Sequence, residues 1–197
     1  MTDVIEGESF RNEDWYGEEL AERTYTGCEF AHVDLTEAAS RGTVFTECSF
    51  TNVRFNASRH TDSAFLRCTF KRCNFFEAEF LGCKLIGSLF QQSVLRPLKV
   101  IGGDWSFVGL PGADLRGVTV QGVRMREVDL TAANCADAAL VDVDLSGAQL
   151  HSVNLAGCDL RGSDLSALDP STAQLTGAII QSAQAVVVAQ TLGFEVR

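Results

Sequence analysis

Apolar residues recur at every fifth position along almost the whole chain, and this period restricts the possible folds more than any other feature. Of the 35 multiples of five from Phe10 to Ile180, 32 are apolar, and ten of the 13 phenylalanines fall among them. The phase is unchanged from Ile5 to Ile180, so no inserted loop shifts it. The exceptions are Ser40, His60 and Pro170.

A period of five excludes a long helix or a flat strand. One face of a helix repeats every 3.6 residues and one face of a strand every 2, so neither keeps every fifth residue on one side. A chain that turns a corner after every five residues does. Four such sides close a coil, and successive coils pair at the ordinary interstrand spacing of about 4.8 Å.

Two positions of each repeat should point into the coil. One is the large apolar residue, and the other is the residue two places before it, which is usually small. Glycine often lies two places after the large residue, as at Gly112, Gly117 and Gly122. We expect it at the corner, where unusual backbone angles are needed.

The seven cysteines follow the same repeat. Six of them, at positions 28, 48, 68, 73, 83 and 158, take the small inward position, and Cys135 takes a large one. No C-x-x-C motif occurs, and His32, His60 and His151 lie far apart, so the spacing does not favour a metal site. Because buried cysteine commonly acts as a small apolar residue, we assign these residues a structural role.

Residues 20 positions apart should stack on one side of the coil. This rule places Ser40 beside His60 inside the core, where we expect a hydrogen-bonded pair rather than a functional site. It also predicts a column of aromatic rings at Phe10, Phe30, Phe50, Phe70 and Phe90.

The segments ADLRG at residues 113–117 and SDLS at 163–166 resemble the consensus of the pentapeptide-repeat family, and the similarity extends along nearly the whole chain. The resemblance implies an all-β fold, a right-handed quadrilateral β-helix, followed by a short C-terminal α-helix. Residues 1–181 would form the β-helix, of about nine coils at the strand spacing. Around Pro97, which has no N–H to donate to a ladder, we expect a local distortion or a cis peptide bond.

The five-residue period stops near the C-terminus, where residues 182–197 should form a helix and tail. Serine can cap a helix and glycine can end one, so the helix is predicted from Ser182 to Gly193. It is too short to be stable alone, and we expect it to cover the last coil. Its apolar residues are also candidates for a two-fold dimer contact. They are Val186, Val187, Ala189, Leu192 and Phe194.

The chain carries 26 acidic and 16 basic residues, and the excess lies at its two ends. Residues 1–25 contain eight acidic and two basic residues, and residues 101–197 contain 11 and five, so each segment has a net charge of −6. A dimer through the C-terminal ends would be a narrow acidic rod of about 85 Å, comparable to about 25 base pairs of DNA. The aspartates predicted to form this DNA-mimicking surface are Asp104, Asp114, Asp129, Asp137, Asp142, Asp144, Asp159 and Asp164.

The segments LRPL at 95–98 and DLSGA at 144–148 resemble more closely the mycobacterial fluoroquinolone-resistance members of the family. That resemblance implies a DNA mimic that binds DNA gyrase, a type II topoisomerase, and modulates or inhibits it. The implied partners are gyrase and a second copy of the chain, with no cofactor, no direct binding to nucleic acid and no membrane. Fluoroquinolone protection would follow from this interaction.

A β-helical scaffold with a partner other than gyrase is the alternative. An enzyme is not favoured, because no P-loop, G-x-G-x-x-G or G-x-S-x-G motif occurs. A narrow coil filled with phenylalanine and leucine also leaves no substrate cavity. The acidic N-terminus and the lack of an apolar run of about 20 residues predict a cytoplasmic protein.

Overall fold

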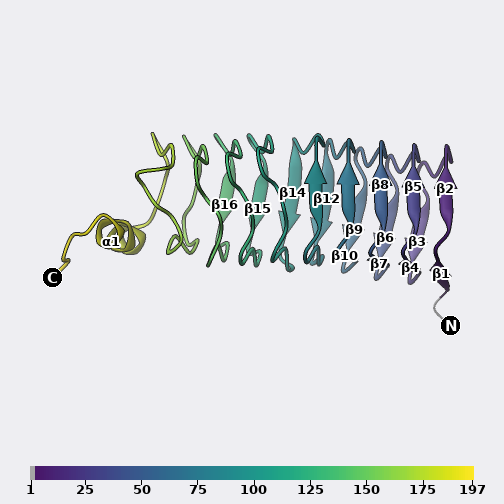
Figure 1. Cartoon of the computed structure of the whole chain (residues 1–197), viewed down its shortest axis with the longest axis horizontal. Coiled ribbons are helices and arrows are strands. Elements are labelled where there is room, and N and C mark those ends of the chain that lie inside the picture. The colour runs from purple at the N-terminus through teal and green to yellow at the C-terminus, as the bar shows by residue number, and fades with distance from the viewer. Residues whose placement is uncertain (1–2) are drawn as a thin grey trace.

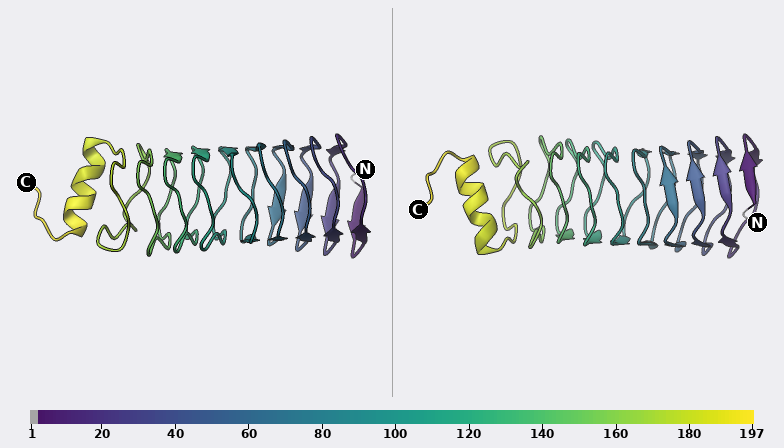
Figure 2. Two further views of the ribbon diagram at one scale, coloured as in Figure 1. Left: turned by 90° about the horizontal axis from the view of Figure 1, so that it is seen from above. Right: turned by 90° about the horizontal axis from the view of Figure 1, so that it is seen from below.

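The structure is a computed structural model that describes residues 3–197, and it shows a rod of stacked coils with a helix at its C-terminal end (Figure 1). The first two residues of the predicted β-helix, 1–2, lie outside the described part. Each coil has four sides, because short strands or bridges alternate with tight turns, and Figure 2 shows the coils stacked along one axis. No helix in the described part of the chain is long and apolar enough to cross a membrane.

We number the four faces in chain order. The first face consists of β1 (Val4–Glu6), β4 (Thr24–Thr26), β7 (Val44–Thr46) and β10 (Ala64–Leu66). The second consists of β2 (Ser9–Arg11), β5 (Glu29–Ala31), β8 (Ser49–Thr51), β11 (Thr69–Lys71) and β13 (Leu89–Gln91). The fourth consists of β3 (Glu19–Ala21), β6 (Ala39–Arg41), β9 (Arg59–Thr61), β12 (Ala78–Leu81), β14 (Leu98–Ile101), β15 (Thr119–Gln121) and β16 (Ala139–Val141). The third is built from isolated bridges between residues 14, 34, 54, 74 and 94, and between 114, 134, 154 and 174.

Every pairing is parallel and joins residues 20 positions apart. The ladder runs from Val4 with Thr24 at one end to Asp159 with Ile179 at the other. The central residue of each strand and the residue two places before it are buried along most of the rod, while the flanking residues face solvent. The four-sided coils predicted from the five-residue period, and the β-helix that the family resemblance implies, are therefore confirmed.

Most corner positions have a positive φ, whether or not the residue is glycine. Gly82 has φ 65°, and Asn52 and Arg72 adopt 54° and 53°. A left-handed backbone costs a residue with a Cβ roughly 1–2 kcal/mol, but the corner N–H gains a regular partner in the next coil. The N–H of Asn52, for example, donates to the carbonyl of Lys71 at 2.9 Å. Glycine in the sequence therefore identifies only some of the corners, and other residue types occupy the rest.

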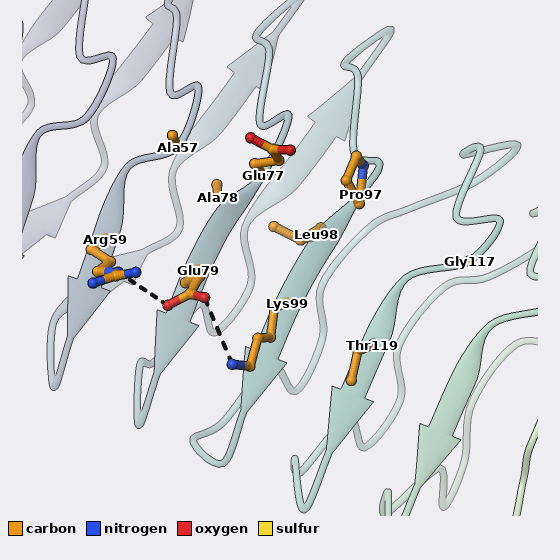
Figure 3. A pocket seen from close by; sticks show the side chains of 10 residues that line it. All are labelled: Ala57, Arg59, Glu77, Ala78, Glu79, Pro97, Leu98, Lys99, Gly117 and Thr119. Carbon is orange, nitrogen blue, oxygen red and sulfur yellow. Dashed lines mark hydrogen bonds and ion pairs between the residues drawn. The ribbon is translucent and has the colours of Figure 1, made fainter.

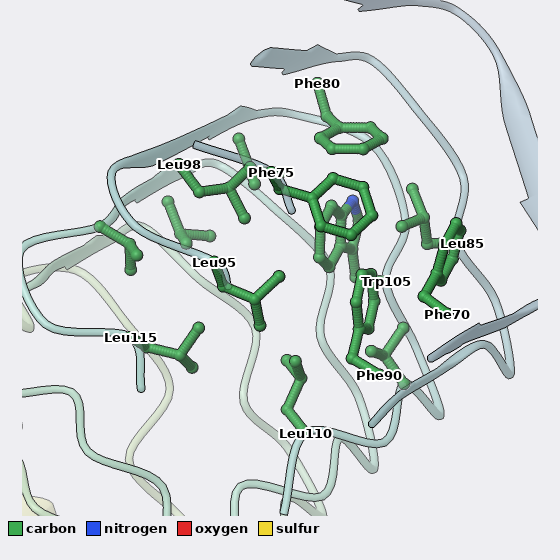
Figure 4. Packing of buried hydrophobic residues seen from close by; sticks show 14 of the residues in the cluster. Phe70, Phe75, Phe80, Leu85, Phe90, Leu95, Leu98, Trp105, Leu110 and Leu115 are labelled. Atoms are coloured by element: carbon green, nitrogen blue, oxygen red, sulfur yellow. The ribbon is translucent and has the colours of Figure 1, made fainter. Parts of the chain in front are cut away.

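Stacked aromatic rings fill the N-terminal part of the core, and Figure 4 shows the middle of the rod, where they meet leucine side chains. The ring centroids of Phe50 and Phe70 are 4.9 Å apart, and those of Phe70 and Phe90 are 4.7 Å apart, which confirms the predicted column. Beyond Phe90 the core changes to leucine, and Trp105 lies at the change with its indole N–H buried and without a hydrogen-bond partner among the described residues. An apolar void of about 20 Å³ lies there, so this is a less tightly filled part of the core.

A buried polar cluster interrupts the aromatic core at His60. Its Nδ1 lies 2.7 Å from the hydroxyl of Ser40, as expected from the 20-residue rule, and its Nε2 lies 3.1 Å from Ser58. Ser58 donates its own proton to the carbonyl of Phe55, so the network favours Nε2–H as the donor to Ser58 and Nδ1 as the acceptor. The ring also stacks on Phe80, at 4.8 Å between centroids.

The third face is interrupted at Pro97, where the Arg96–Pro97 peptide bond is cis. Within residues 3–197, no bridge joins Val94 to residue 114, although the fourth face continues in register through β12, β14 and β15. Close by, Gly103 has φ 91°, and a Cβ there would collide with the backbone of Cys83. The predicted distortion therefore affects one face while the other ladders remain continuous.

The C-terminal helix, α1 (Ser182–Thr191), lies across the last coil (Figure 2). The prediction that Ser182 caps it was wrong, because the cap is Gln181. The backbone N–H of Gln181 donates to Oε1 of Gln184 at 2.7 Å, and its carbonyl accepts from the backbone N–H of Gln184 at 3.0 Å. Gly193 follows the end of the helix with φ 87°, a conformation that glycine adopts without steric cost.

Candidate functional surfaces

Four of the eight aspartates predicted for the acidic surface form ion pairs with arginine. Hydrogen bonds from Arg116 hold the pKa of Asp114 below its ordinary value, and Arg161 lowers the pKa of Asp159 in the same way. Each of these carboxylates has an arginine beside it, so the pair as a whole contributes little negative potential at the surface of the rod. The pairs, at 2.6–2.9 Å, are Asp104 with Arg124, Asp114 with Arg96 and Arg116, Asp144 with Arg126, and Asp159 with Arg161.

The other four, Asp129, Asp137, Asp142 and Asp164, have no lysine or arginine within ion-pair distance in the described part of the chain. Asp129 and Asp164 accept hydrogen bonds from backbone N–H groups two residues on, at 2.9 and 2.8 Å. The carboxylates of Asp137 and Asp142 lie over the glycine corners of the next coil, at positions 157 and 162, where a Cβ would collide with them. We call these four residues the unpaired aspartates.

The unpaired aspartates do not share one face. Register places Asp164 on the first face and Asp129 on the second, while Asp137 and Asp142 lie at the corners on either side of the fourth face. The available negative charge is therefore distributed around the C-terminal half of the rod. This arrangement differs from a single acidic stripe and can present charge to a partner that encloses the rod.

Two shallow depressions flank Pro97. The one on the fourth face has a volume of about 400 Å³ (Figure 3). There Glu79 forms ion pairs with Arg59 at 3.2 Å and with Lys99 at 3.7 Å. The other, of about 500 Å³, is lined partly by exposed Phe76 and Val94. The lining residues contain no nucleophile paired with a base, so these depressions offer contact surface rather than catalytic groups.

All seven cysteines are buried and free. The thiol of Cys73 donates to the carbonyl of Phe50 at 3.3 Å, and that of Cys83 donates to the carbonyl of His60 at 3.2 Å. Burial raises the pKa of Cys73 and of Cys135 to about 12, so both thiols are protonated near neutral pH. Among the described residues no group of three or more His, Cys, Asp or Glu is placed to hold a metal ion.

The exposed side of the C-terminal helix and tail is apolar. Val186, Leu192 and Phe194 are 39%, 53% and 66% exposed, while Val187 and Ala189 are half-buried. Val188, which the sequence analysis did not single out, packs against the core instead. Exposed apolar side chains are typical of a contact surface, and three of the five residues proposed for dimerisation are exposed here.

A family model for pentapeptide repeats matches eight copies, at residues 26–59, 61–92, 110–147, 129–166 and 154–185. The chain belongs to the pentapeptide-repeat family. The matches leave out residues 93–109, which contain Pro97 and the strand that follows it. The departure from the consensus therefore coincides with the interruption of the third face.

Two relatives extend the comparison. The pentapeptide repeat protein MfpA of Mycobacterium tuberculosis is 36% identical over 116 residues, which are 59% of this chain and about half (52%) of MfpA. A trypsin-treated variant of QnrB1, described as a plasmid-mediated fluoroquinolone resistance protein, superposes with a TM-score of 0.84. The superposition covers 98% of this chain and 100% of that QnrB1 chain, and at 18% identity it shows a shared fold.

Gln184 ties the helix to the last coil of this repeat protein, and the sequence analysis missed it. Its side-chain Nε2 donates to the carbonyls of Leu160 and Ser163 at 2.7 and 2.8 Å. If the repeat continued, the backbone N–H at position 184 would bond to Ser163, so the side chain replaces that ladder bond. The available signal was a polar residue 20 positions after Asp164, inside an otherwise Ala- and Val-rich segment.

Replacing Gln184 by alanine is expected to lower the free energy of unfolding by about 1–3 kcal/mol, because two buried carbonyls lose their donor. Equilibrium denaturation of the variant and the wild type measures the difference. Gln190→Ala is the matched control, since Gln190 is exposed on the same helix. Equal destabilisation by the two changes would show that Gln184 has no special role in closing the last coil.

Proposed function

We propose that this protein is a DNA mimic that binds DNA gyrase and reduces fluoroquinolone-stabilised DNA cleavage. The observation that carries the proposal is a narrow, rigid rod with unpaired aspartates around its C-terminal half. The resemblance to mycobacterial fluoroquinolone-resistance proteins supports it, as does the shared fold with QnrB1. The mechanism requires no bond-making chemistry by the protein.

Binding would depend on shape and charge together. A gyrase surface that holds DNA must be basic, and a rod with distributed carboxylates would be attracted to it from several directions. Salt should weaken the attraction, because exposed charges are screened within about 8–10 Å at physiological ionic strength. The protein would then compete with a DNA segment for the same path through the enzyme.

Dimerisation through the apolar surface of α1 would complete the mimic. Two rods joined at their C-terminal ends would place their acidic halves next to each other and double the length of the charged rod. A two-fold contact uses the same residues twice, so exposed Val186, Leu192 and Phe194 of each copy would be buried together. The N-terminal coils would then form the two ends of the assembly.

The test is a gyrase supercoiling assay, with quinolone-induced cleavage as a second readout, across a range of protein and salt concentrations. Inhibition that weakens as salt rises is the expected result. If neither supercoiling nor cleavage changes in low salt, gyrase is not the partner. The remaining candidate is then a scaffold for another protein, for which exposed Phe76 and Val94 beside Pro97 provide an uncharged contact.

The unpaired aspartates should matter more than the paired ones. Changing all four unpaired aspartates to asparagine is expected to weaken gyrase inhibition about tenfold or more, because electrostatic complementarity is lost. The matched control removes whole ion pairs, changing Asp104, Asp144 and Asp159 to asparagine together with their partners Arg124, Arg126 and Arg161 to glutamine, so that the net charge stays the same. Asparagine retains an oxygen to accept the turn hydrogen bonds, so both variants should fold. An equal or larger loss in the control would contradict this assignment.

A further inference from the structure

In the described part of the chain, the strands of the first coil are edge strands. Strands β1, β2 and β3 each form the last strand of their sheets, so each has a pairing partner only in the following coil. The core is also incompletely covered here: Ile5, Phe10 and Trp15 are half-buried, whereas the equivalent residues one coil later are 1–2% exposed. Backbone groups without a pairing partner, surrounding apolar side chains that solvent can reach, form a template on which another chain can stack. We call these apolar side chains the plate. The equivalent residues are Tyr25, Phe30 and Leu35.

Four carboxylates belong to the first coil, one on each of its four sides. They are Asp3, Glu8, Glu13 and Glu18, and they occupy the inward position that is small or apolar in most later repeats. They are not part of a frayed end, because the carbonyl of each accepts a ladder hydrogen bond from the second coil, at 2.9–3.0 Å. The first coil therefore departs from the repeat at four equivalent positions with the same type of charge.

We infer that these four carboxylates, which we call the terminal ring, prevent a second copy of the chain from stacking on the N-terminal end. A stacked coil would come within the strand spacing of about 4.8 Å and would enclose the carboxylates without water or a counter-charge. Two N-terminal ends facing each other would also bring eight like charges together. Arg23 lies in the same column as Asp3 one coil later and interacts with the charges of Asp3 and Glu18, but its single positive charge is smaller than the four negative charges of the ring.

The opposite end is closed in a different way. There, Gln184 bonds to the carbonyls of the last coil and α1 lies across that coil (Figure 2), while Val186, Leu192 and Phe194 remain exposed. An isologous contact at that end gives a closed dimer. A second contact at the N-terminal end would join such dimers into a filament. The terminal ring thus limits the rod to association at one end, and this inference is independent of whether gyrase is the partner.

The test replaces the four carboxylates of the terminal ring in the full chain. The variant Asp3→Ala, Glu8→Ala, Glu13→Ala, Glu18→Ala should form larger species in sedimentation velocity, with at least twice the wild-type mass as concentration rises. If the C-terminal ends already pair, the product is a filament. A folded domain fused before residue 1 should block this association, because it would cover the N-terminal end.

The matched control is Glu6→Ala, Asp14→Ala, Glu19→Ala, Glu22→Ala. It removes four carboxylates from the same part of the chain but at outward positions, and it should keep the wild-type mass. If the alanine ring variant does not fold, as judged by circular dichroism, the isosteric set Asp3→Asn, Glu8→Gln, Glu13→Gln, Glu18→Gln replaces it. The inference is overturned if the folded ring variant keeps the wild-type mass at every concentration, or if the control associates equally.

Discussion

Replacing Phe70 by aspartate is expected to destroy the fold of the central coils. The Phe70 side chain is 0% exposed, and its ring lies 4.9 and 4.7 Å from those of Phe50 and Phe90. Loss of such a buried ring alone costs about 3–5 kcal/mol, and the new charge has no partner in the core. Because a typical domain is stable by only about 5–15 kcal/mol, the variant should lose its cooperative thermal transition.

Circular dichroism and limited proteolysis would measure this effect. In a solenoid each coil contacts only its neighbours, so cleavage should begin near position 70 and extend in both directions. Phe76→Asp is the matched control, since Phe76 is 43% exposed and the change in chemistry is identical. The control should remain folded. A Phe70→Asp variant that melts with the wild type would mean that this position does not point into the core.

The pattern of inward residues could be predicted because it depends on a short period. Once the chain turns every five residues, residues such as Phe50 and Phe70, or Ser40 and His60, must stack at a separation of 20. No tertiary detail is needed, since each coil repeats the geometry of the last. The same regularity made Pro97 stand out, because its missing N–H conflicts with the ladder at that position.

The charged surface could be predicted less well, because ion pairing depends on the directions of long side chains. Arg124 pairs with Asp104 along a 20-residue column, which register alone suggests. Arg126 instead reaches diagonally to Asp144, 18 positions away, and Arg161 pairs with Asp159 two positions before it. The list of candidate aspartates therefore overestimated the number of unpaired carboxylates, since half of these residues form ion pairs with arginine.

The two ends illustrate a further limit of reasoning from periodicity. A repeat predicts what each coil does for the next one, but it says nothing about how the first and last coils end. The side chain of Gln184 makes a hydrogen bond that a backbone N–H would make in a further coil. Glu8 and Glu13 depart from the repeat consensus, and their role is evident only from their position in the edge strands' coil. Residues that break a period at its ends therefore merit the same attention as those that maintain it.

Acidification is expected to destabilise the rod through His60, and the direction follows from its burial. Desolvation lowers the pKa of His60 in the folded protein to about 3, whereas an unfolded histidine titrates near 6.5. Between these values the unfolded state binds one more proton, so this part of the stability is fully present above pH 6.5 and is lost as pH falls. The loss is about 1.4 kcal/mol per pH unit, or about 4–5 kcal/mol by pH 3.

The variant His60→Phe isolates this effect, because phenylalanine can stack on Phe80 and carries no proton. Ser58 and Ser40 keep other partners, since Ser58 donates to the carbonyl of Phe55 and Ser40 lies 2.9 Å from the hydroxyl of Ser63. Unfolding free energies of both proteins should diverge between pH 6 and pH 5, before most carboxylates titrate, with the wild type falling more steeply. Parallel curves would show that His60 is hydrated or charged in the folded protein, and the neutral Ser40–His60–Ser58 network would then have to be abandoned.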